Sequence, residues 1–188
     1  MDNTPPRLRR AYFECRHGQL HVHNAIPVGG GFDELTTLIC VHGAAGSGRV
    51  FLELSRHLGS SRSVYSPDLP GCGESDAPEG KLSISGYADA VADFLDSMRF
   101  RQVDLLGSGA GAAVAAELAV SRPKVVRKVC LVGFGSQEAG PAAALAAAGA
   151  AWAPERLQAV QQPVSKMDGA LETDAVGVAK RVAEFLAS

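Results

Sequence analysis

The stretch LLGSGAG, residues 105–111, lies at the junction of two different sequence patterns. Residues 103–106 form a short apolar run, which is typical of a buried parallel strand. Residues 110–121 are mostly small and apolar, and they predict a helix. The stretch therefore predicts a strand that leads into a helix through a short connection rich in glycine.

The same strand-then-helix pattern recurs along the chain. Strands that alternate with helices predict a parallel sheet with crossover helices on both faces. Near the N-terminus, residues 11–25 show two alternating runs separated by a turn and predict a β-hairpin. Residues 154–170 contain two prolines and a glycine and show no convincing strand. The expected strands are residues 37–42, 63–66, 103–106 and 129–132, and the expected helices are residues 49–58, 83–98, 110–121, 139–153 and 175–186.

Size and composition indicate one globular domain. The chain has 188 residues, of which 46% are hydrophobic and 20% are charged, and its formal net charge is −2. This charge argues against nucleic acid or an anionic membrane surface as a partner. No apolar run is long enough to span a bilayer, and the N-terminus lacks an apolar signal core. We therefore expect a cytoplasmic protein whose residues 1–10 form a flexible tail.

Four motifs occur in a fixed order, and together they resemble the α/β-hydrolase superfamily. The resemblance covers about residues 12–135 and the last helix. It implies the α/β class and a three-layer sandwich, with a mostly parallel sheet of about six strands and an N-terminal antiparallel hairpin, in one domain spanning residues 1–188. The chain is short for this superfamily, so we expect the last two strands to be lacking and residues 139–170 to form a reduced lid or linker. The motifs are VHGAAG at 41–46, YSPDLPGCGESD at 65–76, LLGSGAG at 105–111, and LAVSRP at 118–123 followed by LVG at 131–133.

The resemblance does not supply a recognisable catalytic triad. In the superfamily, the nucleophile lies at the centre of a sharp strand-to-helix turn called the nucleophile elbow. That position corresponds to Gly109, and the position of the general base corresponds to Met167. No histidine follows His57, and Glu138 is the only nearby candidate for the acid after the sixth strand. The glycine-rich elbow is also similar to that of the N-myc downstream-regulated family, which looks like a hydrolase without a triad.

Ser108 is the neighbouring hydroxyl that could substitute for the nucleophile. Because side chains alternate in direction along a strand, we expect Ser108 to point away from the substrate position. A residue other than glycine in the strained conformation of an elbow costs about 1–3 kcal/mol. Glycine at position 109 therefore relieves the strain and removes the nucleophile with it.

A binding pocket is expected where the nucleophile would have been. The resemblance implies that the backbone N–H groups of Ala44 and Ala110 form an oxyanion hole. Both groups are expected near a helix N-terminus, where N–H donors attract negative oxygen. His42 is expected to brace this loop rather than to transfer protons. The expected ligand is a small molecule with a carbonyl or carboxylate group, and the expected ligand-binding residues are His42, Gly43, Ala44, Gly109 and Ala110.

No cofactor and no metal are expected. His21 and His23 share one face of a strand at a spacing that suits a metal, but no Asp, Glu or Cys obviously completes the set. Residues 43–50 resemble a phosphate-binding loop without its lysine, and residues 107–112 resemble a dinucleotide fingerprint without its acidic partner. The four cysteines lack C-x-x-C spacing, so neither a disulfide framework nor a zinc ribbon is indicated.

Three functions remain open. The first is a pseudoenzyme that binds a small molecule or acts as a regulatory protein. The second is a cofactor-independent lyase, isomerase or cyclase that uses the oxyanion hole. The third is a weak esterase that uses Ser108. The candidates for a catalytic role are Ser108, His42 and Glu138.

The strand at residues 129–132 would leave an apolar edge of the sheet open. Such an edge invites pairing with another chain. We therefore expect residues 142–160 to pack over that edge, or two protomers to meet there as a homodimer.

Overall fold

The protein contains one mixed sheet of seven strands, in the order β1-β2-β4-β3-β5-β6-β7. The computed structural model describes residues 5–30, 35–44, 46–135, 140–168 and 171–188. The β1–β2 and β2–β4 pairs are antiparallel, and the remaining pairs are parallel. This topology confirms the predicted hairpin and the mostly parallel sheet. The strands are β1 (Arg7–Cys15), β2 (Gly18–Ile26), β3 (Thr37–Val41), β4 (Val64–Pro67), β5 (Val103–Ser108), β6 (Val126–Val132) and β7 (Val164–Met167).

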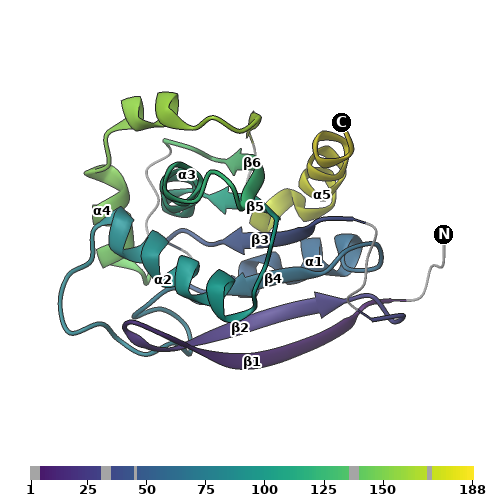
Figure 1. Ribbon diagram of the computed structural model, residues 1–188, viewed down its shortest axis with the longest axis horizontal. Coiled ribbons are helices and arrows are strands. Elements are labelled where there is room, and N and C mark those ends of the chain that lie inside the picture. The colour runs from purple at the N-terminus through teal and green to yellow at the C-terminus, as the bar shows by residue number, and fades with distance from the viewer. Residues whose placement is uncertain (1–4, 31–34, 45, 136–139, 169–170) are drawn as a thin grey trace.

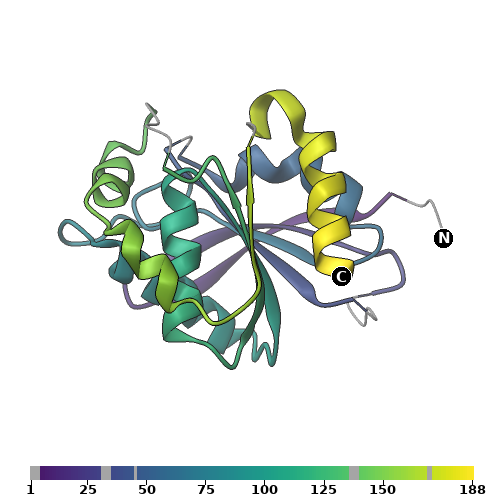
Figure 2. The ribbon, with the colours of Figure 1, turned by 90° about the horizontal axis from the view of Figure 1, so that it is seen from above.

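Helices cover both faces of the sheet and complete the predicted three-layer sandwich. Figure 2 shows α1 and α5 on one side and α2, α3 and α4 on the other. Side chains alternate along each strand, so Leu105 packs toward α2 and α3 while Leu106 packs toward α1 and α5. No helix in the described ranges is long and apolar enough to cross a membrane. The helices are α1 (Leu52–Leu58), α2 (Ile84–Ser97), α3 (Ala110–Ser121), α4 (Ala143–Ala150) and α5 (Leu171–Ala187), with short 3-10 helices η1 (Gly48–Phe51) and η2 (Pro154–Ala159).

The C-terminal part of the sheet differs from the prediction. The last two strands were expected to be lacking, but β7 pairs in parallel with β6 along Val129–Val132. The sheet therefore has seven strands rather than six. The sequence signal was weak because β7 is only four residues long and contains Ser165 and Lys166. Pairing with β6, rather than local preference, determines this strand.

Residues 142–160 do not cover the β6 edge, because β7 occupies it. Instead, α4 and η2 pack against α3, as Figure 1 shows beside the sheet. The reason for expecting a dimer at residues 129–132 is therefore removed. The new edge strand is β7, whose short length and exposed Lys166 are features that discourage pairing with other chains.

The prediction of a flexible segment at residues 1–10 is also wrong from Arg7 onward. Residues 1–10 were predicted to be flexible, but β1 begins at Arg7 and its first residues pair with β2 from Ile26 to His23. Backbone hydrogen bonds of the antiparallel ladder order the arginine-rich segment even though its side chains are exposed.

Candidate ligand-binding site at the turn after β5

The turn between β5 and α3 has the conformation expected of a nucleophile elbow, with glycine at its centre. Gly109 has φ 54° and ψ −122°, which lies in a region that L-residues with a side chain rarely adopt. Its N–H donates a hydrogen bond to the carbonyl of Val132 at 2.9 Å, which ties the turn to the end of β6. The turn is therefore sharp and fixed, but its central residue offers no reactive atom.

Gly107 and Gly111, on either side of the turn, let the backbone of α3 pack directly against the backbones of β5 and β3. A Cβ at Gly111 would lie 2.3 Å from the carbonyl oxygen of Val41 and 2.4 Å from that of His42. A Cβ at Gly107 would lie 2.5 Å from the Cα of Ala112. These contacts hold the N-terminus of α3 against the end of β3.

His42 is a buried bracing residue. Its Nδ1 hydrogen bonds to the carbonyl of Gly43 at 2.9 Å, and its Nε2 accepts the N–H of Leu69 at 2.9 Å. These partners assign the proton to Nδ1, because a carbonyl only accepts and an N–H only donates. Burial lowers the pKa of His42 below its usual value, so the ring is neutral. Both nitrogens are used to join the loop after β3 to the turn after β4.

A cavity of about 510 Å³ opens beside the elbow, between α3, α4 and the segment before η2. Of the five predicted ligand-binding residues, Gly109 and Ala110 line it, whereas the other three lie outside its lining. Among the residues the structure describes, no ionisable side chain faces this cavity. Its wall is built from small residues and two aromatic rings. It consists of Gly109, Ala110, Ala113, Phe134, Gly135, Ala146, Ala147, Gly149, Ala150, Trp152 and Pro154.

The loop that carries Ala44 is packed under a neighbouring segment. The N–H of Ala142 donates to the carbonyl of Ala44 at 3.3 Å. A Cβ at Gly140 would lie 2.1 Å from the same carbonyl oxygen, so the two backbones are in direct contact. Of the two residues predicted to form the oxyanion hole, Ala110 lines the cavity, whereas Ala44 is not part of its lining and its carbonyl lies against residues 140–142.

Neither Ser108 nor Met167, the position that corresponds to the general base, lines the cavity. Ser108 is the last residue of β5, is half-buried opposite Val132, and is not part of the lining. Met167 ends β7 and is buried in the core on the α1 and α5 side of the sheet. Glu138 lies outside the described residues.

Four residues in or behind the cavity wall were not predicted. The Nε1–H of Trp152 donates to Glu117 at 3.0 Å, and the ring of Trp152 meets that of Phe134 edge-on with centroids 6.0 Å apart. Arg156 adds two hydrogen bonds to the same carboxylate. The signal that sequence reasoning missed was Glu117 itself, which is the only charged residue of an otherwise apolar helix.

We expect the side of the cavity that Trp152 forms to be held less firmly in acid, because Glu117 anchors it. The hydrogen bond from Arg156 lowers the pKa of Glu117 below its usual 4.5, and burial opposes this only in part. An acid whose pKa is lowered by folding stabilises the protein above its unfolded pKa, and this contribution is lost as the pH falls through the folded value. The emission of Trp152 and the free energy of unfolding should therefore change below about pH 4.5. In Glu117→Gln this acid-dependent component should be absent, and its persistence would contradict the assignment.

The sequence comparisons agree with the fold. The Alpha/beta hydrolase family matches residues 38–187, which is most of the chain. The chain therefore belongs to the alpha/beta hydrolase family.

Individual relatives cover the chain only in part. An uncharacterized protein of Mycobacterium tuberculosis is 28% identical over 134 residues, which are 71% of this chain and 37% of the relative. A 2-hydroxymuconate semialdehyde hydrolase of a Pseudomonas species (strain CF600) is 34% identical over 77 residues, which are 40% of this chain and 27% of the relative. The chain thus spans well under half the length of these curated relatives.

Among solved structures, the naproxen esterase (carboxylesterase NP) of Bacillus subtilis has a TM-score of 0.71 at 15% identity. The match covers 97% of this chain and 93% of the esterase. An N-acyl homoserine lactonase mutant complexed with N-hexanoyl homoserine has a TM-score of 0.68 at 19% identity, over 87% of this chain and 78% of the lactonase. At such identities the likeness concerns the fold alone.

Proposed function

We propose that this chain binds a small molecule with an apolar acyl or aromatic part in the cavity beside Gly109, and that it does not hydrolyse this ligand through a covalent intermediate. The observation that carries the proposal is the combination of an apolar cavity with an elbow whose central residue is glycine. Because the chain spans only part of its curated relatives, the proposal concerns this domain.

The cavity suits an apolar ligand. Its volume of about 510 Å³ falls within the range of small-molecule sites, about 300–1,000 Å³. Burying apolar surface contributes about 25 cal/mol per Å², so a short acyl chain or an aromatic ring gains binding energy against alanines, Phe134 and Trp152. This lining favours an acyl or aryl group over a sugar or a nucleotide.

The polar end of the ligand is expected at the N-terminus of α3. The first N–H groups of a helix have no acceptor within the helix, and the helix dipole makes this end partly positive. Ala110 begins α3 and lines the cavity, so its N–H can bind a carbonyl or carboxylate oxygen. The proposed ligand is thus an apolar carboxylate or carbonyl compound.

Covalent hydrolysis is disfavoured by the placement of the candidate groups. A nucleophile and a general base must lie within hydrogen-bonding reach of each other and of the substrate. Gly109 has no side chain, Ser108 is not part of the cavity lining, and both ring nitrogens of His42 are used by backbone groups. A lyase or isomerase would also need an acid or base at the cavity, and the described lining contains none.

Trp152 provides a direct assay, because it is the only tryptophan in the chain and it lines the cavity. Titration with decanoate and with 2-naphthoate should change its fluorescence saturably. Ala146→Phe fills the cavity and should weaken binding at least about tenfold, a loss of about 1.4 kcal/mol. Ala144→Phe is the matched control, since Ala144 is an exposed residue of the same helix outside the lining, and its affinity should equal that of the wild type. Absence of saturable binding, or equal affinity in Ala146→Phe, would refute the proposal.

A further inference from the structure

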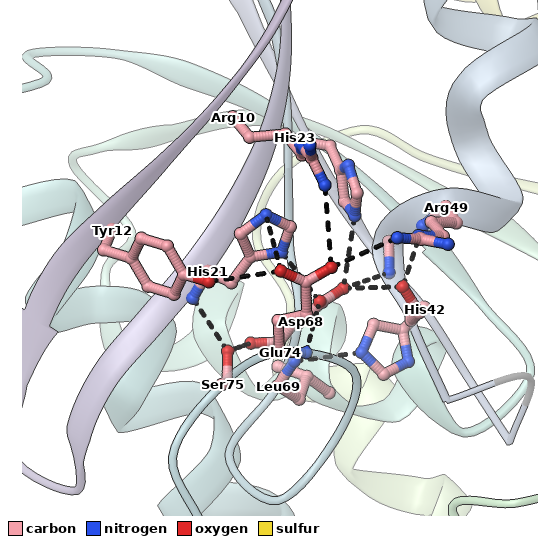
Figure 3. Close-up of polar contacts among 12 residues, drawn as sticks. Arg10, Tyr12, His21, His23, His42, Arg49, Asp68, Leu69, Glu74 and Ser75 are labelled. Atoms are coloured by element: carbon pink, nitrogen blue, oxygen red, sulfur yellow. Dashed lines mark hydrogen bonds and ion pairs between the residues drawn. The ribbon is translucent and has the colours of Figure 1, made fainter.

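Two histidines and an aspartate meet in the interior, away from the cavity beside Gly109. His21 and His23 lie on β2, and Asp68 lies just after β4, as Figure 3 shows. The three residues are 1%, 6% and 1% exposed. One nitrogen or oxygen from each of them lies within 4.8 Å of the others. The sequence predicted no metal because no carboxylate was evident, but the fold brings Asp68 to the histidine pair.

The two imidazole rings have unused nitrogen atoms. Nδ1 of His21 lies 2.9 Å from an oxygen of Asp68 and donates to it, so Nε2 of the same ring retains its lone pair. Nε2 of His21 and Nε2 of His23 are both buried and have no hydrogen-bond partner. Burying a polar nitrogen without a partner is unfavourable, and a metal ion is one group that would satisfy both lone pairs.

We propose that His21 and His23, each through Nε2, and the carboxylate of Glu74 bind a divalent transition-metal ion of the zinc type, with Asp68 supporting His21 from the other side of its ring. Two imidazoles and one carboxylate match the donors that zinc prefers, whereas calcium and magnesium favour oxygen alone. The ligand atoms of a tetrahedral zinc ion lie about 3.3 Å apart, so the Glu74 oxygen, 4.0 Å from Nε2 of His21, needs only a small shift.

The surrounding contacts are those of a supported site. One oxygen of Asp68 orients His21, and the other lies 3.7 Å from Nε2 of His23. A carboxylate that orients a histidine is the usual outer support of a protein metal ligand. Asp68 also accepts hydrogen bonds from Ser47 and from the backbone N–H groups of Gly48 and Glu74, so it is held as a support rather than free to bind the ion. Glu74 places a carboxylate oxygen 4.0 Å from Nε2 of His21 and can supply the third ligand.

Charge and access set the conditions for binding. Glu74 is paired with Arg49 at 3.1 Å and with Arg10 at 3.7 Å. These guanidinium groups repel a cation, so binding requires Glu74 to exchange them for the ion. Both arginine side chains are about 60% exposed and can turn into solvent. A cavity of about 300 Å³, lined by both arginines and His23, provides the entry path.

The test is metal binding to the purified chain, with any affinity tag removed. Zn²⁺ titration by calorimetry should show one site per chain, and the thermal midpoint should rise with Zn²⁺. His23→Gln should weaken Zn²⁺ binding at least about tenfold. His57→Gln, on the exposed face of α1, is the matched control and should bind as the wild type does. No binding by the wild type, or equal binding by His23→Gln, would overturn the proposal.

Co²⁺ provides a measurement that needs no substitution. The visible spectrum of the Co²⁺-bound wild type should lack thiolate-to-cobalt bands, because no cysteine belongs to the cluster. The ring protons of His21 and His23 should show paramagnetic shifts in the proton spectrum. Thiolate bands, or shifts confined to other histidines, would overturn the proposal even if His23→Gln failed to fold.

Discussion

Replacing Gly111 by alanine is expected to lower the free energy of unfolding by about 3 kcal/mol. The added methyl group would lie 2.3 Å and 2.4 Å from the carbonyl oxygens of Val41 and His42. Both are backbone atoms, one in the last residue of β3 and one in the residue after it, so neither can turn away as a flexible side chain would. The helix α3 would have to move away from the sheet, and the wall of the cavity at Ala110 would move with it.

Urea unfolding of Gly111→Ala beside Gly86→Ala tests this expectation. Gly86 is a helical glycine of α2, and a Cβ there meets only the side chain of Leu82 at 3.4 Å or more. Because alanine is favoured over glycine within a helix, Gly86→Ala should leave stability unchanged or raise it by up to about 1 kcal/mol. Similar stabilities for the two variants would show that the backbone contact at Gly111 is not as tight as described.

Replacing Asp104 by leucine is expected to lower the free energy of unfolding by about 3–5 kcal/mol. Asp104 is fully buried in β5 and accepts hydrogen bonds from Arg127 at 2.9 Å and 2.6 Å and from Arg62 at 3.3 Å. Burial raises the pKa of Asp104, and the hydrogen bonds from Arg127 oppose this. Without the carboxylate, Arg62 remains only 3% exposed with its ion pair lost.

The matched control is the exposed pair of Glu53 and Arg56 on α1. Exposed ion pairs contribute about 0–1 kcal/mol, so Glu53→Leu should have a small effect. Denaturant titrations of both variants measure the difference. A loss in Asp104→Leu no larger than that in Glu53→Leu would mean that the buried cluster contributes little to stability.

Much of the fold was predictable because its signals are local. In the hairpin of β1 and β2, apolar and polar residues alternate. From β5 to α3, and from β4 to α2, the sequence changes from a short apolar run typical of a buried strand to the residue spacing of a helix. The strand β7 was missed because Ser165 and Lys166 interrupt its pattern, and only the partner strand β6 makes it a strand. The tail was misjudged for the same reason, since pairing with β2 orders Arg7 to Arg10.

The candidate site was predictable only where one motif contains it. Gly109 and Ala110 follow each other in the elbow, and both line the cavity. Phe134 and Trp152 come from segments with no motif, and the fold alone places them opposite α3. Asp68 could not be predicted for the same reason, because it is 47 residues from His21 in the sequence and only the fold brings the two together.

The central claim is that the elbow of this alpha/beta hydrolase carries no nucleophile. Treatment with a fluorophosphonate, followed by intact-mass measurement, tests it most directly. We predict that the wild type acquires no covalent adduct, and that Gly109→Ser shows no ester hydrolysis because no histidine is placed to activate the new hydroxyl. A stoichiometric adduct on Ser108 that is lost in Ser108→Ala would contradict the claim.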